Sequence, residues 1–173
     1  EDILIPGKHN FENAAASAMA AYLVGVKKDQ IVQVLKNFKG LEHRLELIRE
    51  IGGVKYYDDS FSTIPETTIA AIEAFDGPEI LILGGSQGAE LINNAIVDAI
   101  PRLVENYQII HQTGVKNHKM VSGRAEVVLG DSPHKLRYLS MPFLNPLQMK
   151  MAAGAASIII SRAGSTLFEI ASW

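Results

Sequence analysis

Cysteine is absent from this chain of 173 residues. Its absence excludes a disulfide framework, a thiol nucleophile and a thiolate metal site. An excess of basic residues is also missing, because the formal net charge is −3 at pH 7. Nucleic-acid binders usually carry a basic stripe, so nucleic acid is not expected as a partner. His111 and His118 have no metal-ligand spacing, and the sequence predicts no metal site.

Long hydrophobic runs are missing too. No apolar stretch approaches the ~20 residues of a membrane-spanning helix, and no signal peptide is present. We therefore expect a cytoplasmic protein that is not transmembrane. The chain opens with "EDILIPG" and closes with "EIASW" inside an expected helix. These ends suggest an excised piece, and a truncated last helix would expose an apolar patch that favours a homodimer.

The first half is predicted to be helical and then to form a hairpin. Helices are expected over 10–25 and 28–38, the first of them closed by Gly25. "RLELIRE" and "GVKYYDD" flank Gly52-Gly53, which predicts a β-hairpin of residues 44–50 and 53–59. A further helix is expected over 63–75, with Thr63 as its cap.

In the second half, short apolar strands alternate with helices. Strands are expected at 79–83, 107–112, 125–129 and 157–161, with a further segment at 138–144. Helices are expected at 88–105, 146–154 and 165–172, and a short one near 115–122. This alternation predicts a parallel sheet covered on both faces. The expected fold is α/β: a single Rossmann-like, doubly wound, mostly parallel sheet in one domain of residues 1–173, with an antiparallel hairpin near the start and a helical N-terminal segment.

The segment "LGGSQGA" follows the predicted strand 79–83 and opens a helix. Gly84 and Gly85 permit a sharp turn, and Ser86 offers a hydroxyl. The amides of residues 87–90 would form the positive end of the helix, which suits an anion. The alternative is a strand-to-helix turn that simply requires glycine.

A second glycine loop follows the predicted strand 157–161, in "SIIISRAGSTLFEIA". Gly164 is followed by Ser165 and Thr166, which open a helix, and Glu169 lies one turn inside it. A carboxylate there suits the two hydroxyls of a ribose; alternatively, the helix dipole favours a glutamate near the N-terminus. Two such loops at one end of a sheet favour a nucleotide as the ligand.

From about Ile80 to Trp173, the motifs "LGGSQGAELINNAI", "YQIIHQTG" and "MPFLNPLQMKMAAGAASIIISRAGSTLFEIA" resemble the C-terminal half of the MurG glycosyltransferase family. That family transfers N-acetylglucosamine (GlcNAc) from UDP-GlcNAc to lipid I in peptidoglycan synthesis. The resemblance implies that the first loop faces the donor diphosphate, that a backbone group after "PF" pairs with uracil, and that a glutamate holds the ribose. The UDP-GlcNAc-binding residues that it implies are Ser86, Gln87, Leu144, Gly164, Ser165, Thr166 and Glu169.

Residues from 1 to about 84 resemble the C-terminal domain of the Mur ligases, in particular that of the D-glutamate ligase MurD. The resemblance rests on "GKHNFEN", "GLEHRLE" and "YDDS", in the order found in that family. It implies that Asn13, Arg44 and Asp59 help to hold ATP and that Thr63 lies near the amino-acid substrate. Phe61 stands where a typical ligase has lysine. Without the family, an Arg44–Asp59 pair across the hairpin is the alternative.

These two resemblances predict a chimera, natural or engineered, of peptidoglycan-synthesis pieces. A GxxxxGK[ST] phosphate-binding loop is absent from the sequence, as is the glycosyltransferase acceptor domain, so no catalytic residue is assigned. We expect no required cofactor, no turnover and at most weak binding of UDP, UDP-GlcNAc or ATP. The alternative is a fragment of a working cell-wall enzyme, either a MurG-like N-acetylglucosaminyltransferase or a MurD-like ATP-dependent ligase.

Overall fold

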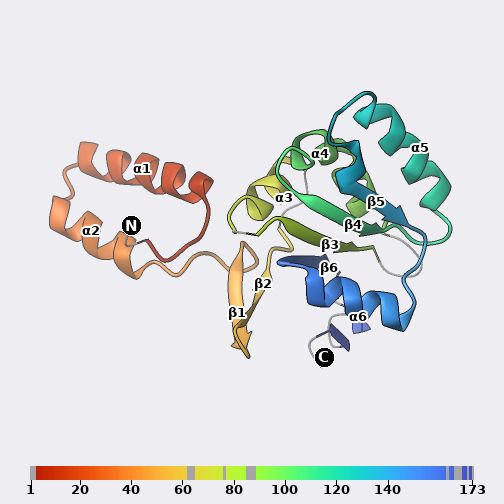
Figure 1. Cartoon of the computed structure of the whole chain (residues 1–173). Helices are drawn as coiled ribbons and strands as arrows, with labels where there is room; N and C mark the ends of the chain where they lie inside the picture. Colours follow the sequence, from red (N-terminus) through yellow and green to blue (C-terminus); the bar gives the residue numbers. More distant parts are fainter. Residues whose placement is uncertain are drawn as a thin grey trace. The chain divides into compact units, whose positions relative to one another are not determined.

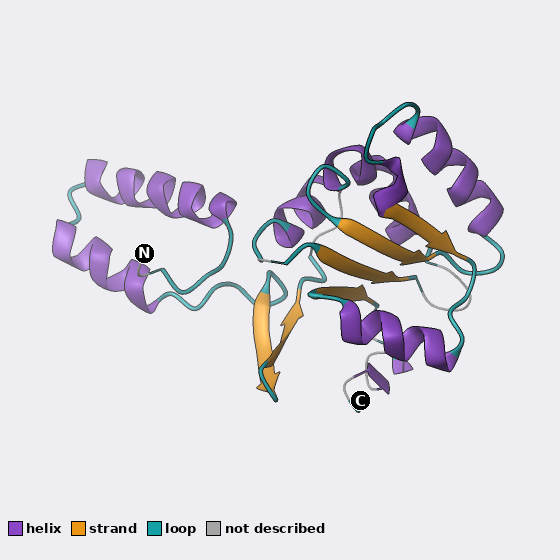
Figure 2. Ribbon diagram, viewed as in Figure 1, coloured by secondary structure: helices purple, strands orange, loops and turns teal. Residues whose placement is uncertain are grey.

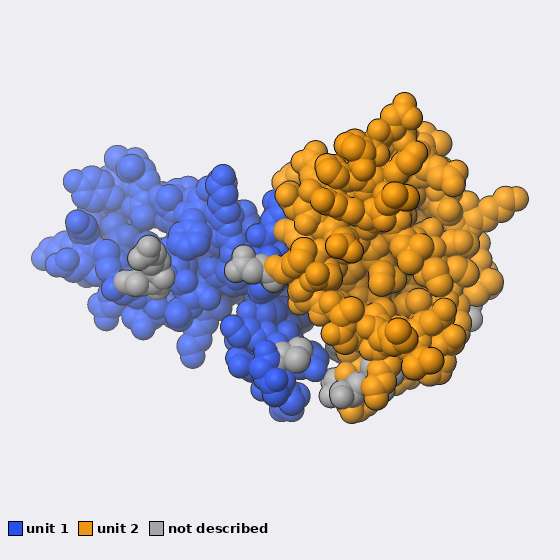
Figure 3. All heavy atoms as spheres, in the orientation of Figure 1, with its two compact units in different colours: residues 1–75 blue, residues 76–173 orange. Residues whose placement is uncertain are grey.

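The computed structural model describes residues 3–61, 65–75, 77–84, 89–162, 164–165, 169–170 and 172. The chain divides into two compact units, residues 1–75 and 76–173, which are coloured separately in Figure 3. The expectation of a single domain remains a prediction.

Unit 1 opens with two helices, α1 (Lys8–Leu23) and α2 (Lys28–Asn37), as the sequence predicts. Helix α1 begins after Gly7, whose φ of 96° is accessible to glycine without strain. The Asn10 side chain donates a hydrogen bond of 2.6 Å to the Pro6 carbonyl. Gly25, with a φ of 90°, follows the end of α1 and donates to the Tyr22 carbonyl, which confirms its predicted place at the helix C-terminus.

The predicted hairpin is present as β1 (Glu46–Ile51) and β2 (Val54–Asp58), which pair in antiparallel register. Gly52 and Gly53 form its turn with φ of 58° and 86°, the positive values that two-residue hairpin turns require. The hairpin is a two-stranded sheet of its own among the described strands, whereas the sequence-based expectation had one sheet. Helix α3 (Pro65–Ile72) follows, and Thr63 lies outside the described residues.

Unit 2 is built on a four-stranded parallel sheet in the order β5-β4-β3-β6 (Figure 2). Its strands are β3 (Glu79–Leu83), β4 (Gln108–Gln112), β5 (Tyr138–Met141) and β6 (Ile158–Ser161). The predicted parallel sheet is therefore confirmed. The central strand β3 is buried on both faces: Ile80, Leu81, Ile82 and Leu83 are each at most 2% exposed.

Helices cover both faces of this sheet. Leu81 and Leu83 pack with Met149 and Ala152 of α6 (Pro146–Ala155) on one face. Successive side chains of a strand point to opposite faces, so Ile80 and Ile82 point to the other one. Helix α4 (Glu90–Leu103) lies on that other face with α5 (His118–Leu129) beside it, as Figure 1 shows. A short 3₁₀ helix, η1 (Lys135–Arg137), leads into β5.

One predicted strand is wrong. Residues 125–129 belong to α5, which is a single helix from His118 to Leu129, rather than a short helix near 115–122 followed by a strand. Val121, Ala125 and Leu129 are its buried residues, spaced four apart as one face of a helix requires. Val127 is 80% exposed. The helical spacing of the buried face therefore outweighs the β propensity of the two valines.

The predicted helix over 165–172 is only partly covered by the described residues. Among these, Ser165, Glu169 and Ile170 are helical. In the part of the chain that the structure describes, every helix is too short or too polar to cross a bilayer.

Candidate nucleotide site at the carboxyl edge of the sheet

Three loops leave the parallel sheet at one edge. Strand β3 lies between β4 and β6, and Leu83 is paired with Gln112 on one side and with Ser161 on the other. All three strands are parallel, so their carboxyl ends meet at the same edge. The two glycine loops, after Leu83 and after Ser161, therefore start from neighbouring strands. In doubly wound sheets this edge is where ligands bind.

Gly84 is required at the start of the first loop by close packing. Its amide donates a hydrogen bond of 3.0 Å to the Gln112 carbonyl. A Cβ atom at this position would lie 3.0 Å from that carbonyl oxygen and 3.1 Å from Asn93 Oδ1. Any larger residue would push β4 or α4 away, so glycine keeps the N-terminal part of α4 close to the sheet edge.

A buried polar network joins that part of α4 to β4 and β5. His111 Nε2 lies 3.0 Å from Asn93 Oδ1, and His111 Nδ1 lies 2.9 Å from the Tyr138 hydroxyl. Asn93 also donates from Nδ2 to the Thr113 carbonyl over 2.9 Å. Asn93 Oδ1 must therefore accept, which places the imidazole hydrogen on Nε2 and makes Tyr138 the donor to Nδ1.

Burial fixes the charge state of this network. His111 is fully buried, and this burial lowers its pKa to about 4. Burial also raises the pKa of the Tyr138 hydroxyl. Both groups are therefore neutral at pH 7. The sequence-based expectation of a core or surface histidine holds for His111, but nothing in the sequence indicated Asn93 or Tyr138 as its partners.

Gln112 organises the loop after β5. Its side-chain oxygen accepts a 2.9 Å hydrogen bond from the backbone amide of Leu144, and Gln112 itself is 2% exposed. The Leu144 side chain is buried in the cluster with Leu83 and Met149. The loop that leads into α6 is thus attached to the end of β4 by a side-chain hydrogen bond and by apolar packing.

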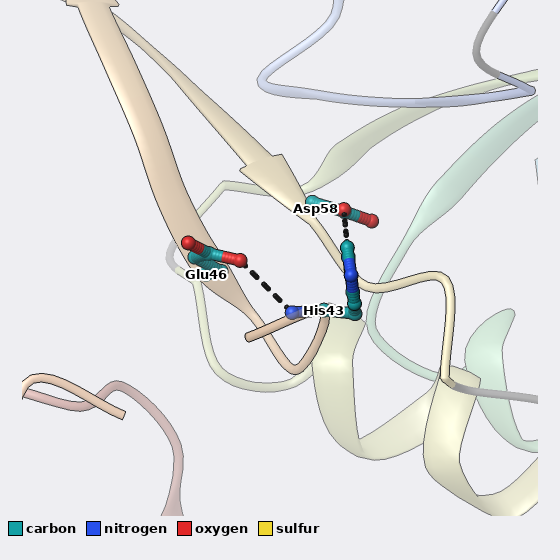
Figure 4. A group of neighbouring side chains, drawn as sticks. All are labelled: His43, Glu46 and Asp58. Atoms are coloured by element: carbon teal, nitrogen blue, oxygen red, sulfur yellow. Dashed lines mark hydrogen bonds and ion pairs between the residues drawn. The ribbon is translucent and has the colours of Figure 1, made fainter. Parts of the chain in front are cut away.

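In unit 1, polar groups gather at the base of the hairpin (Figure 4). His43 Nδ1 lies 2.7 Å from Asp58 Oδ2, and the His43 amide donates to Glu46 Oε2 over 2.9 Å. The hydrogen bond that His43 donates to Asp58 raises the pKa of His43 and lowers the pKa of Asp58. Asp59, next in the chain, accepts a hydrogen bond of 3.1 Å from the Leu45 amide.

The comparison with protein families bears on unit 2. The model of the glycosyltransferase family 28 C-terminal domain matches residues 79–173, more than half of the chain. The chain belongs to this family. The match begins at the first residue of β3 and includes both glycine loops. The resemblance that the sequence motifs indicated is therefore confirmed for this part of the chain.

The curated relatives of this glycosyltransferase family 28 chain include ligases. A UDP-N-acetylmuramoylalanine–D-glutamate ligase of Thermoanaerobacter sp. (strain X514) is 46% identical over 117 residues, which cover 67% of this chain and 25% of the relative. The corresponding ligase of Caldicellulosiruptor bescii is 37% identical over 139 residues, 74% of this chain and 30% of the relative. The chain thus spans 25% to 30% of the length of these ligases.

The ligase similarity is longer than predicted. An alignment of 117 residues exceeds the 78 that precede the family match, so the two similarities share residues. The fold agrees: a MurF structure from Acinetobacter baumannii superposes with a TM-score of 0.56 at 16% identity, covering 96% of this chain and 36% of that one.

The structure describes four of the seven residues that the glycosyltransferase resemblance implies. The Leu144 amide is bonded to Gln112. The Gly164 amide donates to the Arg162 carbonyl over 2.8 Å, Ser165 is exposed at the start of the last helical segment, and Glu169 is exposed one turn later. The other three lie outside the described residues: Ser86, Gln87 and Thr166.

The residues implied by the ligase resemblance lie on separate elements. Asn13 is exposed on α1, and Arg44 is exposed two residues before β1. Asp59 follows β2, and the hydrogen bond from Leu45 to Asp59 brings the segment of Arg44 beside it. The expected Arg44–Asp59 pair stays a prediction, and Thr63 lies outside the described residues.

Proposed function

We propose that residues 76–173 form a weak binding site for a uridine diphosphate sugar, UDP-GlcNAc or UDP itself, at the carboxyl edge of the sheet. The chain as a whole is then a cytoplasmic chimera of peptidoglycan-synthesis pieces that turns over neither parent reaction. The diphosphate lies against the loop that follows Gly84, and the ribose hydroxyls lie against the Glu169 carboxylate. Two partial loops should give an affinity around millimolar, about −4 kcal/mol.

The observation that carries this proposal is the adjacency of β3 and β6. Because Leu83 and Ser161 are register partners, the loop that starts at Gly84 and the loop that contains Gly164 leave from neighbouring strands. One nucleotide is long enough to reach both loops. The network of Asn93 and His111 supports the proposal further, because it holds the N-terminal part of α4 at this edge.

The absence of turnover follows from what each parent reaction needs. Ligation requires a phosphate-binding loop of the GxxxxGK[ST] type, which the sequence lacks. Glycosyl transfer requires an acceptor and a base within hydrogen-bonding reach of it. No residue of unit 2 is assigned as this base, either among the residues that the structure describes or among those that the resemblance implies.

Saturation-transfer NMR of UDP-GlcNAc in the presence of the protein tests the proposal. We expect a saturable signal that UDP displaces and ATP does not. Glu169→Gln should weaken binding by about tenfold to a hundredfold, as the loss of a charge-assisted hydrogen bond of about 1.5–3 kcal/mol implies. The matched control is Glu126→Gln, an exposed carboxylate on α5, which should leave the signal unchanged. Equal effects of the two variants, or equal competition by ATP, contradict the proposal.

A second candidate function is favoured by the coverage of the relatives. Because the chain spans only 25–30% of the ligases that it matches, it is also the size expected of a fragment of a working cell-wall enzyme. The complete reading frame distinguishes the two proposals. A GxxxxGK[ST] loop encoded upstream favours the ligase fragment, and a glycosyltransferase acceptor domain favours the transferase fragment. Neither is expected for the chimera.

A further inference from the structure

Three potential metal ligands meet at the base of the hairpin in unit 1. His43 and Glu46 lie where the chain enters β1, and Asp58 is the last residue of β2 (Figure 4). One ligand atom from each side chain lies within 4.8 Å of the other two. Antiparallel pairing explains the meeting, because Glu46 and Asp58 are register partners. Residues 15 apart in the sequence are thereby brought to one point.

The backbone around these side chains is fixed by hydrogen bonds. The Phe61 amide donates to the His43 carbonyl over 3.1 Å, and the Ser60 amide donates to Asp58 Oδ1 over 3.0 Å. The Leu45 amide donates to Asp59 Oδ1. His43 and Leu45 have φ of 62° and 43°, in the left-handed region that few non-glycine residues occupy. The tight turn that results holds the imidazole against the Asp58 carboxylate.

We propose that His43, Glu46 and Asp58 bind a divalent transition-metal ion, with zinc as the best fit. The ion would lie where a hydrogen now joins His43 Nδ1 to Asp58 Oδ2. Ligand atoms of a tetrahedral zinc, each about 2.0–2.2 Å from the metal, are about 3.3 Å apart. The imidazole nitrogen and the Asp58 oxygen, now 2.7 Å apart, need to separate by only about 0.6 Å. The Glu46 carboxylate approaches by rotation of its side chain.

The donor set selects the class of metal. One imidazole nitrogen with two carboxylate oxygens suits zinc, nickel or cobalt. Calcium requires six to eight oxygen ligands, and magnesium keeps most of its own water, so both fit this site poorly. Three protein ligands leave a fourth position for water or for an anionic oxygen of a ligand. His43 is half exposed, so this position is open to solvent.

The oxygen atoms in use do not prevent binding. A carboxylate has two oxygens with about four acceptor positions. Glu46 uses Oε2 for the His43 amide, and Asp58 uses Oδ1 for the Ser60 amide. Asp58 Oδ2 is the atom that faces the imidazole. The site therefore keeps its supporting hydrogen bonds when a metal replaces the bridging hydrogen.

Calorimetric titration of the protein with zinc at pH 7.5, with cobalt as a spectroscopic substitute, tests the proposal. We expect one saturable zinc site per chain and a visible cobalt spectrum that zinc abolishes. His43→Ala and Glu46→Gln should each weaken binding by about tenfold or more, since even loss of an outer partner costs 10–100-fold. Glu46→Gln retains an oxygen for the His43 amide, so it preserves the turn. His134→Ala, at a half-buried position in the turn before η1 of unit 2, is the matched control and should bind zinc as the parent does.

The possible results of the titration distinguish a specific site from adventitious binding. Selective loss in the His43 and Glu46 variants, with an unchanged circular dichroism spectrum, supports the site. The proposal is overturned if the protein shows no saturable zinc binding. It is also overturned if only the His134 variant weakens binding, or if all variants bind zinc equally, because both results indicate adventitious binding by surface groups. Failure of UDP-GlcNAc to bind has no effect on this test, because the three ligands lie in unit 1.

Discussion

Acid should destabilise unit 2 through His111. In the folded protein burial lowers the pKa of this side chain to about 4, against 6.5 for the exposed imidazole of the unfolded chain. Between pH 4 and pH 6.5, the imidazole is mostly protonated in the unfolded state and mostly neutral in the folded state. The stability of unit 2 is therefore intact above pH 6.5, and it is lost progressively as the pH falls towards 4.

The size of this loss follows from the shift of about 2.5 pKa units. At about 1.4 kcal/mol for each unit, the full penalty is about 3.4 kcal/mol, of which about 2 kcal/mol is reached at pH 5 and about 3 kcal/mol at pH 4. A penalty of this size is a large share of the 5–15 kcal/mol that stabilises a typical domain. Tyr138 strengthens the effect, because the hydrogen bond that its hydroxyl donates to His111 Nδ1 requires the neutral imidazole.

Urea unfolding at pH 7, 6, 5 and 4, followed by NMR signals of β3 and β4 amides, measures this loss. The same series on His111→Gln, which cannot take up a proton, subtracts the contribution of the carboxylates. We expect the stability of the parent to fall by about 3 kcal/mol more than that of the variant between pH 7 and 4. An identical fall in both proteins, or an imidazole that titrates near 6.5 in the folded state, refutes the reasoning.

Four further predictions concern the packing of the sheet and its helices. Gly84→Ala should destabilise unit 2 by about 1–3 kcal/mol, since its Cβ would lie 3.0 Å from the Gln112 carbonyl oxygen. In Gly154→Ala, in α6, the added Cβ meets no atom within 4 Å, so this variant should be neutral or more stable by up to about 1 kcal/mol. Equal urea midpoints for the Gly84 and Gly154 variants would contradict this contrast. Gln112→Ala should cost about 1–3 kcal/mol by leaving the Leu144 amide without its acceptor, and faster hydrogen exchange of that amide is the specific readout. Leu83→Ala, at a side chain 1% exposed, should cost about 2–5 kcal/mol, and a loss below 1 kcal/mol in thermal unfolding would disprove tight packing there.

Local patterns predicted most of the fold. Gly52-Gly53 between two strand-like runs predicts the hairpin, and the apolar run of β3 predicts a strand buried on both faces. The strand expected at 125–129 is wrong because β propensity is a weak local preference. The four-residue spacing of Val121, Ala125 and Leu129 becomes informative only when α4 lies beside it.

The candidate sites depended more on distant contacts. Both glycine loops are readable in the sequence, but the position of β3 between β4 and β6 is what brings them together. The network of His111 could not be predicted, because its partners lie 18 and 27 residues away and asparagine and tyrosine are common in surface positions. The group of His43, Glu46 and Asp58 likewise has no metal-ligand spacing and depends on the hairpin register.

Mapping amide shifts of the isotope-labelled protein during titration with UDP-GlcNAc tests the central claim most directly. If the two glycine loops form one half-site, shifts should occur together at Gly84 and Ala89 after β3 and at Gly164, Ser165 and Glu169 after β6, with a single binding curve. The amides of α5 should stay unchanged. Shifts confined to one loop, or absent at both while the sheet remains folded, would contradict a shared nucleotide site.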